Sequence, residues 1–135
     1  MASELSTVLS NCVAAVPECV AAAYVDLNSG LLLTIKAVDS HPTEMYDMLA
    51  AATADMFQGK NIVAIEDMFK KFRGIESEYH YFEEIIVNSA NLLHLFLRGR
   101  KYPDTAVVFI CRRTANLGMA LSRARSSLPE IEMAA

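Results

Sequence analysis

The architecture of this chain is set by three runs near its C-terminus, EEIIVN (Glu83–Asn88), LLHLFLR (Leu92–Arg98) and TAVVFICRR (Thr105–Arg113). Each run is rich in residues that favour strands, and polar, glycine or proline residues separate the runs. Asn116-Leu117-Gly118 follows, and Asn is a preferred residue for capping the start of a helix. The last third of the chain therefore predicts three consecutive strands and a closing helix.

The N-terminal part predicts a helix followed by a hairpin. Apolar residues recur at helical spacing over Glu4–Val16, and Pro17 ends the pattern. Strands are expected at Cys19–Leu27 and Leu31–Val38. The turn between them is Asn28-Ser29-Gly30, where glycine tolerates a positive φ and Asn and Ser cap the local backbone.

A helix with an unusually large apolar surface is expected from Pro42 to about Gln58, before Gly59. Only four of its side chains are clearly polar: Glu44, Asp47, Asp55 and Gln58. A helix that is apolar over most of its circumference is usually buried on more than one side. Two explanations are open. The helix packs against its copy in a homodimer, or the following segment covers it within a monomer.

The following segment, Asn61–Arg73, predicts a second amphipathic helix, or an extension of the first after a break at Gly59, with Gly74 as its stop. Its polar face is expected to carry Glu66, Asp67, Lys70, Lys71 and Arg73. Such a helix more often covers its own domain's core than binds a membrane surface or a partner. The net charge of the helix is too small for membrane capture, so no membrane partner is expected.

Length and composition indicate one domain over residues 1–135, with an insertion at about 60–80 and a loose tail at about 129–135. The net charge of −4 argues against nucleic-acid binding. No apolar run approaches the roughly 18–20 residues that span a bilayer. The first residues do not form a signal peptide, so the cytoplasm is the expected compartment.

No catalytic, cofactor or metal site is expected, and the protein is not predicted to be an enzyme. The histidines are far apart and are expected to include one partly buried in the sheet: His41, His80 and His94. The cysteines lack CxxC spacing and fit packing roles in a reducing compartment: Cys12, Cys19 and Cys111. Glu83 and Glu84 point to opposite faces of a strand, so their carboxylates do not converge.

The order of elements resembles that of the Roadblock/dynein light chain family, in its prokaryotic form, over roughly Leu5 to Arg125. The residues that carry this resemblance are Val20–Ile35, Thr43–Phe57, Glu84–Val87, Leu93–Leu97, Ala106–Cys111 and Asn116–Leu121. The resemblance implies a profilin-like α/β sandwich, α-β-β-α-β-β-β-α, with a five-stranded antiparallel sheet. The extra helix after the central helix departs from a minimal domain of this family.

The resemblance also implies a homodimer, in which the third strand, about Tyr81–Asn88, pairs with its copy across a two-fold axis beneath paired central helices. Self-pairing would remove an exposed strand edge, which is otherwise a liability. The interface residues expected on this basis are Met45, Leu49, Ala52, Met56, Tyr81, Glu83, Ile85 and Val87.

The function that the resemblance implies is a non-enzymatic module that binds and regulates or scaffolds a small Ras-like GTPase. The chain lacks a GxxxxGK[ST] phosphate loop, so it is not expected to be the GTPase itself. Three basic residues of the last hairpin are candidate partner contacts: Arg98, Arg100 and Lys101. The competing interpretation is that these side chains are only solvated.

The alternative function is a small-molecule sensor, because profilin-like sandwiches are similar in architecture to PAS and GAF domains. Flexible methionines adapt to ligands. The candidate pocket residues are Met45, Met48, Met56, Phe69 and Phe72, for which core and interface packing is the competing interpretation.

Overall fold

The chain folds around a five-stranded antiparallel sheet with the strand order β2-β1-β5-β4-β3. This computed structural model describes residues 4–75 and 80–135. Its elements are α1 (Glu4–Ala15), β1 (Cys19–Asp26), β2 (Leu31–Ala37), α2 (Thr43–Gln58), α3 (Lys60–Phe72), β3 (Glu84–Asn88), β4 (Leu92–Arg98), β5 (Thr105–Arg112) and α4 (Leu117–Ala134). The fold class expected from the sequence is confirmed, including the extra helix after the central one.

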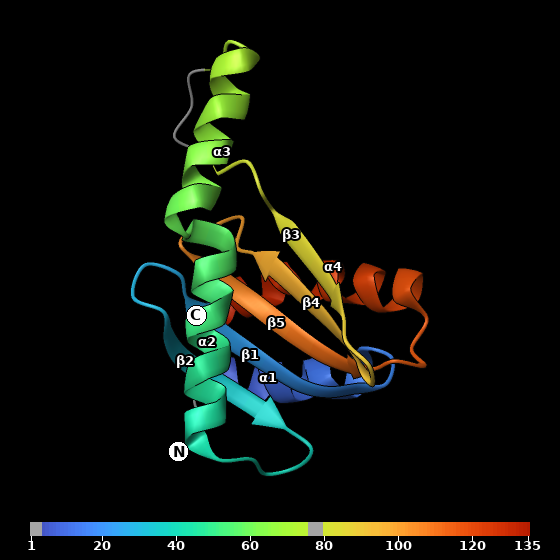
Figure 1. Ribbon diagram of the computed structural model, residues 1–135. Helices are drawn as coiled ribbons and strands as arrows, with labels where there is room; N and C mark the ends of the chain where they lie inside the picture. The colour runs from blue at the N-terminus through green and yellow to red at the C-terminus, as the bar shows by residue number, and fades with distance from the viewer. Residues whose placement is uncertain (1–3, 76–79) are drawn as a thin grey trace.

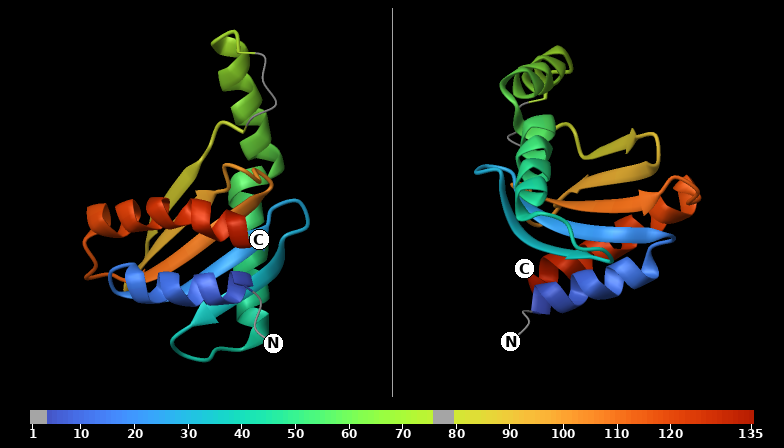
Figure 2. Two further views of the ribbon diagram at one scale, coloured as in Figure 1. Left: turned by 180° about the vertical axis from the view of Figure 1, so that it is seen from behind. Right: turned by 60° about the horizontal axis from the view of Figure 1, so that its bottom comes forward.

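The helices form layers on both faces of the sheet. Helices α1 and α4 cover one face side by side, and α2 crosses the other (Figures 1 and 2). Alternation along β4 supplies both cores, because Leu95 packs under α1 and α4 whereas Phe96 packs with Ala50 and Phe57 of α2. The larger core lies on the α1 and α4 side, and only a smaller cluster lies under α2.

Two local signals read from the sequence are confirmed. In the β1–β2 turn, Gly30 has a φ of 74°, and the Asp26 carboxylate accepts hydrogen bonds from the Ser29 hydroxyl (2.5 Å) and backbone N–H (3.3 Å). At the start of α4, the side chain of Asn116 accepts a hydrogen bond of 3.0 Å from the N–H of Met119. Both the turn and the helix start therefore have their local hydrogen bonds made.

Helix α3 is separate from α2 and extends past the end of the strands (Figure 1). The backbone breaks at Gly59, whose ψ is 153°. The helix ends as expected at Gly74, which has a φ of 69°; Gly74 N–H donates to Lys71 and Ile75 N–H donates to Lys70. The expectation that this helix covers the core is wrong. Within residues 4–75 and 80–135, no strand lies beneath its outer half (Figure 1), and Phe72 remains 93% exposed.

The expectation of a loose tail at about 129–135 is also wrong, because α4 continues to Ala134. Pro129 lies inside the helix, although proline removes a backbone hydrogen bond there. Ile131 is fully buried in the larger core and Glu132 is 3% exposed. Packing of these side chains outweighs the local cost of the proline.

Two negative findings apply to residues 4–75 and 80–135. None of the helices there has the length and apolar character needed to cross a membrane. Nor does that part of the chain gather three or more His, Cys, Asp or Glu side chains in a group that could hold a metal ion.

Candidate interaction surface

Strand β3 is an edge of the sheet. It pairs with β4 on one side, with Ile85 opposite Phe96 and Val87 opposite His94, and no other strand of the described residues lies on its other side. An unpaired edge presents backbone N–H and C=O groups to another chain. The strand is shorter than expected from the sequence, since it begins at Glu84 and not at Tyr81.

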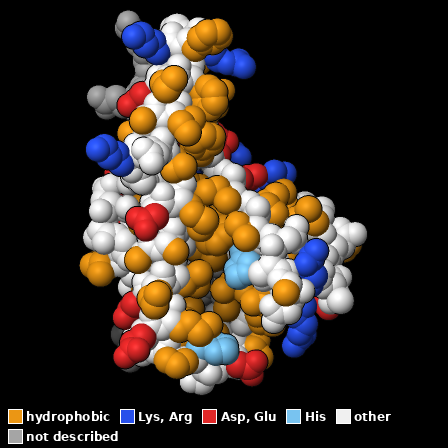
Figure 3. Space-filling view, viewed as in Figure 1, with side chains coloured by type: hydrophobic (Ala, Val, Ile, Leu, Met, Phe, Trp, Pro, Cys, Tyr) orange, Lys and Arg blue, Asp and Glu red, His pale blue; other side chains and the backbone are white. Residues whose placement is uncertain are grey.

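The face of β3, β4 and β5 beside α2 is only partly covered. Ile85 and Ile110 are half-buried there, and Val87 is 36% exposed. Hydrophobic side chains gather over the surface between α2 and β3 and continue along α3 (Figure 3). An exposed apolar surface that joins a free strand edge is characteristic of a protein interaction site.

The four interface residues expected on the central helix form one stripe along α2: Met45, Leu49, Ala52 and Met56. Met45 is 53% exposed and Ala52 is exposed, whereas Leu49 and Met56 are half-buried. Met56 packs against the same apolar cluster as Ile85 of β3. The structure therefore brings the α2 stripe and the β3 residues to one surface.

The segment before β3 is attached to α3 by a buried glutamate. Glu66 is 1% exposed and accepts hydrogen bonds from the backbone N–H groups of Tyr81 and Phe82. Its carboxylate also lies 3.4 Å from Nδ1 of His80. The ring of Phe69 packs against that of Tyr81 at a tilt of 33°, with ring centroids 5.3 Å apart. Tyr81 and Glu83 thus lie in the segment between α3 and β3 and not in the strand.

The placement of Glu66 on a solvated face was therefore wrong. Its carboxylate is buried because two backbone N–H groups need an acceptor there. One signal was available in the sequence. Glu66 lies four residues after Ile62 and three before Phe69, which places it on the apolar side of the helix.

Arg98 is a structural residue and not a partner contact, which corrects the sequence-based expectation. It is 5% exposed, and its guanidinium donates to the backbone carbonyls of Phe82 (2.9 Å), Pro103 (3.0 Å) and Phe57 (3.0 Å). The same group lies 4.9 Å from the centroid of the Phe57 ring. Burial lowers the pKa of Arg98, while Glu66 and Asp104 oppose that shift.

Arg100 and Lys101 are exposed on the β4–β5 hairpin. A second buried carboxylate holds this hairpin, because Glu132 of α4 accepts hydrogen bonds from the backbone N–H groups of Arg100 (3.0 Å) and Tyr102 (2.7 Å). The two cations are therefore presented on a turn with a fixed backbone. Nothing in the sequence around Glu132 indicated this role, since it lies in the segment expected to be loose.

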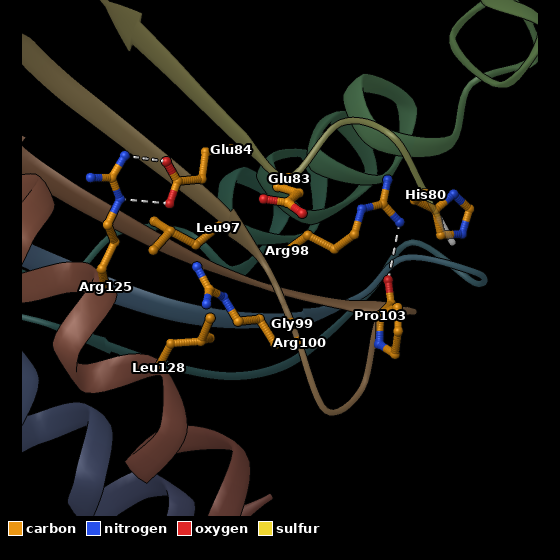
Figure 4. Close-up of a pocket in the computed structure, with 10 residues that line it drawn as sticks. All are labelled: His80, Glu83, Glu84, Leu97, Arg98, Gly99, Arg100, Pro103, Arg125 and Leu128. Atoms are coloured by element: carbon orange, nitrogen blue, oxygen red, sulfur yellow. Dashed lines mark hydrogen bonds and ion pairs between the residues drawn. The ribbon is translucent and has the colours of Figure 1, made fainter. Parts of the chain in front are cut away.

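A cavity of about 320 Å³ lies between the start of β3, the β4–β5 hairpin and α4 (Figure 4). Arg125 of α4 reaches Glu84 of β3 through two hydrogen bonds of 2.6 and 2.8 Å. The hydrogen bonds from Arg125 lower the pKa of Glu84. Arg98, Arg125 and Glu84 are engaged with protein groups and hold the surrounding elements together. His80 and Glu83 also line the cavity.

His94 is partly buried in the sheet, as expected. Its ring stacks on Phe96 with centroids 6.2 Å apart, and its Nε2 lies 3.3 Å from the Ser89 hydroxyl. Burial lowers the pKa of His94, so the neutral ring is favoured. A neutral histidine is compatible with the apolar surface on which it lies.

The residues proposed for a sensor pocket include two that are open to solvent. The cavity beside α4 is not lined by any of the five: Met45, Met48, Met56, Phe69 and Phe72. Met48 and Phe72 are 73% and 93% exposed. The three cysteines are free and buried, which confirms their packing role.

Solved structures of other proteins are similar to this fold over nearly the whole chain. Myxococcus xanthus MglB matches with a TM-score of 0.70 and 17% identity, over 96% of this chain and 86% of that chain. A Roadblock/LC7 domain from Streptomyces avermitilis matches with a TM-score of 0.70 and 14% identity, over 97% of both chains. MglB in a tetrameric arrangement matches with a TM-score of 0.69 and 18% identity, over 96% of this chain and 87% of that chain. No sequence family model and no curated protein sequence matches. The chain has the Roadblock fold.

Proposed function

We propose that this Roadblock-fold protein is a non-enzymatic, cytoplasmic interaction module. It forms a C2 homodimer through β3 and the adjoining apolar surface, and the dimer binds and regulates or scaffolds a small Ras-like GTPase. The observation that carries the proposal is the free edge of β3 beside a half-covered apolar face.

The β3 edge is a better site for self-pairing than β2, the other edge of the sheet. The pairing of β2 with β1 is irregular between Tyr24 and Val25, and β2 carries Lys36. Bulges and lysines both protect edges from further pairing. Strand β3 pairs regularly along its length and carries neither feature. Together with the α2 stripe, it supports an interface of the standard roughly 1,200–2,000 Å².

A GTPase is the partner implied by the Roadblock resemblance, and MglB supports self-association because it has been described in a tetrameric arrangement. On this chain the candidate contacts are Arg100 and Lys101, which the Glu132 carboxylate holds on a fixed turn. Arg98 is excluded from this role because three backbone carbonyls occupy its guanidinium.

The test is capture of partners from a lysate of the source cells, with added GDP or a non-hydrolysable GTP analogue, followed by mass spectrometry. We expect a small GTPase to be enriched in one nucleotide state. The double variant Arg100→Ala/Lys101→Ala should reduce the enrichment, whereas Arg123→Ala, an exposed arginine on α4, should not. Recovery of no GTPase in either state contradicts the proposed partner.

A further inference from the structure

Helices α2 and α3 together form a rod whose two halves carry opposite charge. Every charged side chain of α2 is acidic, and all of them are exposed: Glu44, Asp47 and Asp55. In α3 and the residue after it, Glu66 is buried and Asp67 is the only exposed acid among the described residues, against four basic residues: Lys60, Lys70, Lys71 and Arg73. Lys and Arg side chains mark the α3 end of the rod, and Asp and Glu mark the far end of α2 (Figure 3).

Helix dipoles explain only part of this separation. A dipole favours acids in the first turn and bases in the last turn of each helix, and Glu44 in α2 and Lys70 and Lys71 in α3 follow that rule. Asp55 near the end of α2 and Lys60 at the start of α3 do not follow it. These two residues extend the charge asymmetry over the whole rod.

An apolar stripe runs along both halves of the rod. On α3, the exposed residues Ile65, Phe69 and Phe72 follow the i, i+4, i+7 spacing of one helix face. On α2, the stripe from Met45 to Met56 continues to the apolar surface of β3. The rod is therefore amphipathic over its whole length. On the α3 half, Tyr81 and Phe82 contact Phe69, whereas Phe72 remains 93% exposed.

We propose that the rods of two copies pack antiparallel, so that α3 of one protomer lies along α2 of the other. This inference rests on the self-association proposed above and assigns α3 a role within it. The two halves are similar in length, about 24 Å for the 16 residues of α2 and about 20 Å for the 13 residues of α3. The basic α3 end then faces the acidic α2 end twice in each dimer, as a two-fold axis requires.

A second copy fits this surface better than a membrane does. An anionic lipid surface would attract the α3 half but repel Glu44 and Asp47 on the same rod. An antiparallel copy pairs both halves at once. The apolar stripe supplies most of the affinity, and the charges select the antiparallel register.

The test is a charge swap measured by sedimentation equilibrium. Lys71→Glu/Arg73→Glu makes both halves of the rod acidic, and Glu44→Lys/Asp47→Lys makes both basic. Each double variant should self-associate at least about tenfold more weakly than the wild-type protein, because four facing charge pairs become repulsive. Mixing the two variants should restore tight association, because each acidic α3 then meets a basic α2. The difference in self-association between the double variants and the wild-type protein should shrink at high salt.

The controls separate the possible failures. Arg123→Glu places the same reversal on α4, off the rod, and should leave self-association unchanged. Circular dichroism and thermal melting should show that all variants remain folded. If both double variants dimerise as tightly as the wild type, or if mixing restores nothing, the rod pairing is wrong while the dimer stands. A wild-type protein that stays monomeric contradicts the proposed homodimer itself.

Discussion

Among the described residues, three buried charged side chains hydrogen-bond to backbone groups: Arg98, Glu66 and Glu132. Arg98 donates hydrogen bonds to three carbonyls, and each glutamate accepts hydrogen bonds from two N–H groups. A buried backbone group without a partner costs about 1–3 kcal/mol. These side chains therefore hold the segment before β3 and the β4–β5 hairpin, which border the proposed interaction surfaces.

Arg98→Lys should destabilise the protein by about 3 kcal/mol. A lysine ammonium cannot reproduce the planar fork that reaches three carbonyls from one position, so buried acceptors lose their donors. Urea unfolding measures the change. Arg100→Lys, on the exposed turn two residues away, should change stability by less than about 0.5 kcal/mol. Equal effects of the two substitutions would mean that Arg98 is an ordinary surface residue.

His94 should make the folded state less stable in mild acid. Its pKa is lowered by burial in the folded state, whereas the unfolded chain titrates near the ordinary value of about 6.5. The unfolded state therefore binds the proton more readily. The stability that the neutral ring contributes is complete above about pH 6.5 and is lost as the pH falls toward the folded pKa. At fixed protein concentration, unfolding at pH 7.5 and 5.5 should show a larger loss for the wild type than for His94→Gln. Parallel losses would rule out His94 as the cause.

Residue-level roles were the part of the structure that the sequence predicted least well. His94 was placed correctly because its neighbours in the strand are apolar. Arg98 was misplaced because a charged residue at a strand end is usually solvated, and only the folded chain brings the carbonyls of Phe57 and Pro103 to its guanidinium. Contacts between segments far apart in the chain are not visible in local patterns.

At the scale of elements, the helices and strands were predicted from the sequence more accurately than the roles of single residues. The strands, the Asn28-Ser29-Gly30 turn and the start of α4 at Asn116 were found because alternation, glycine and capping residues are local signals. The errors lie at the ends: β3 starts late, and α4 ends late. In α4 the proline suggested a break, but Ile131 is fully buried, so tertiary packing overrode the local preference.

The C-terminal turns of α4 give a direct test of that packing. Ile131→Ala should destabilise the protein by about 2–4 kcal/mol, because it leaves a cavity in the larger core. Met133→Ala, two residues further on, should have little effect because Met133 is 79% exposed. Thermal or urea unfolding measures the stabilities of both variants against the wild-type protein. If both substitutions are silent, the end of α4 does not pack in solution.

At the scale of the whole molecule, the surface is asymmetric. One face of the sheet is closed by α1 and α4, while the other is closed by α2 only in part and ends in the free edge of β3 (Figure 2). The sequence anticipated this arrangement through the excess apolar surface of the central helix. It did not anticipate the projecting α3 helix, because a local amphipathic pattern does not show what lies opposite.

The measurement that tests the proposed homodimer most directly is sedimentation equilibrium over a range of protein concentrations. The wild-type chain of 14.9 kDa should fit a monomer–dimer equilibrium. Val87→Lys, on the α2 side of β3, should shift it strongly toward monomer. Ile86 is 42% exposed and lies on the opposite side of the same strand. Ile86→Lys should therefore shift the monomer–dimer equilibrium less. A wild-type protein that remains monomeric at all concentrations, or a dimer that tolerates Val87→Lys, would contradict an interface built on β3.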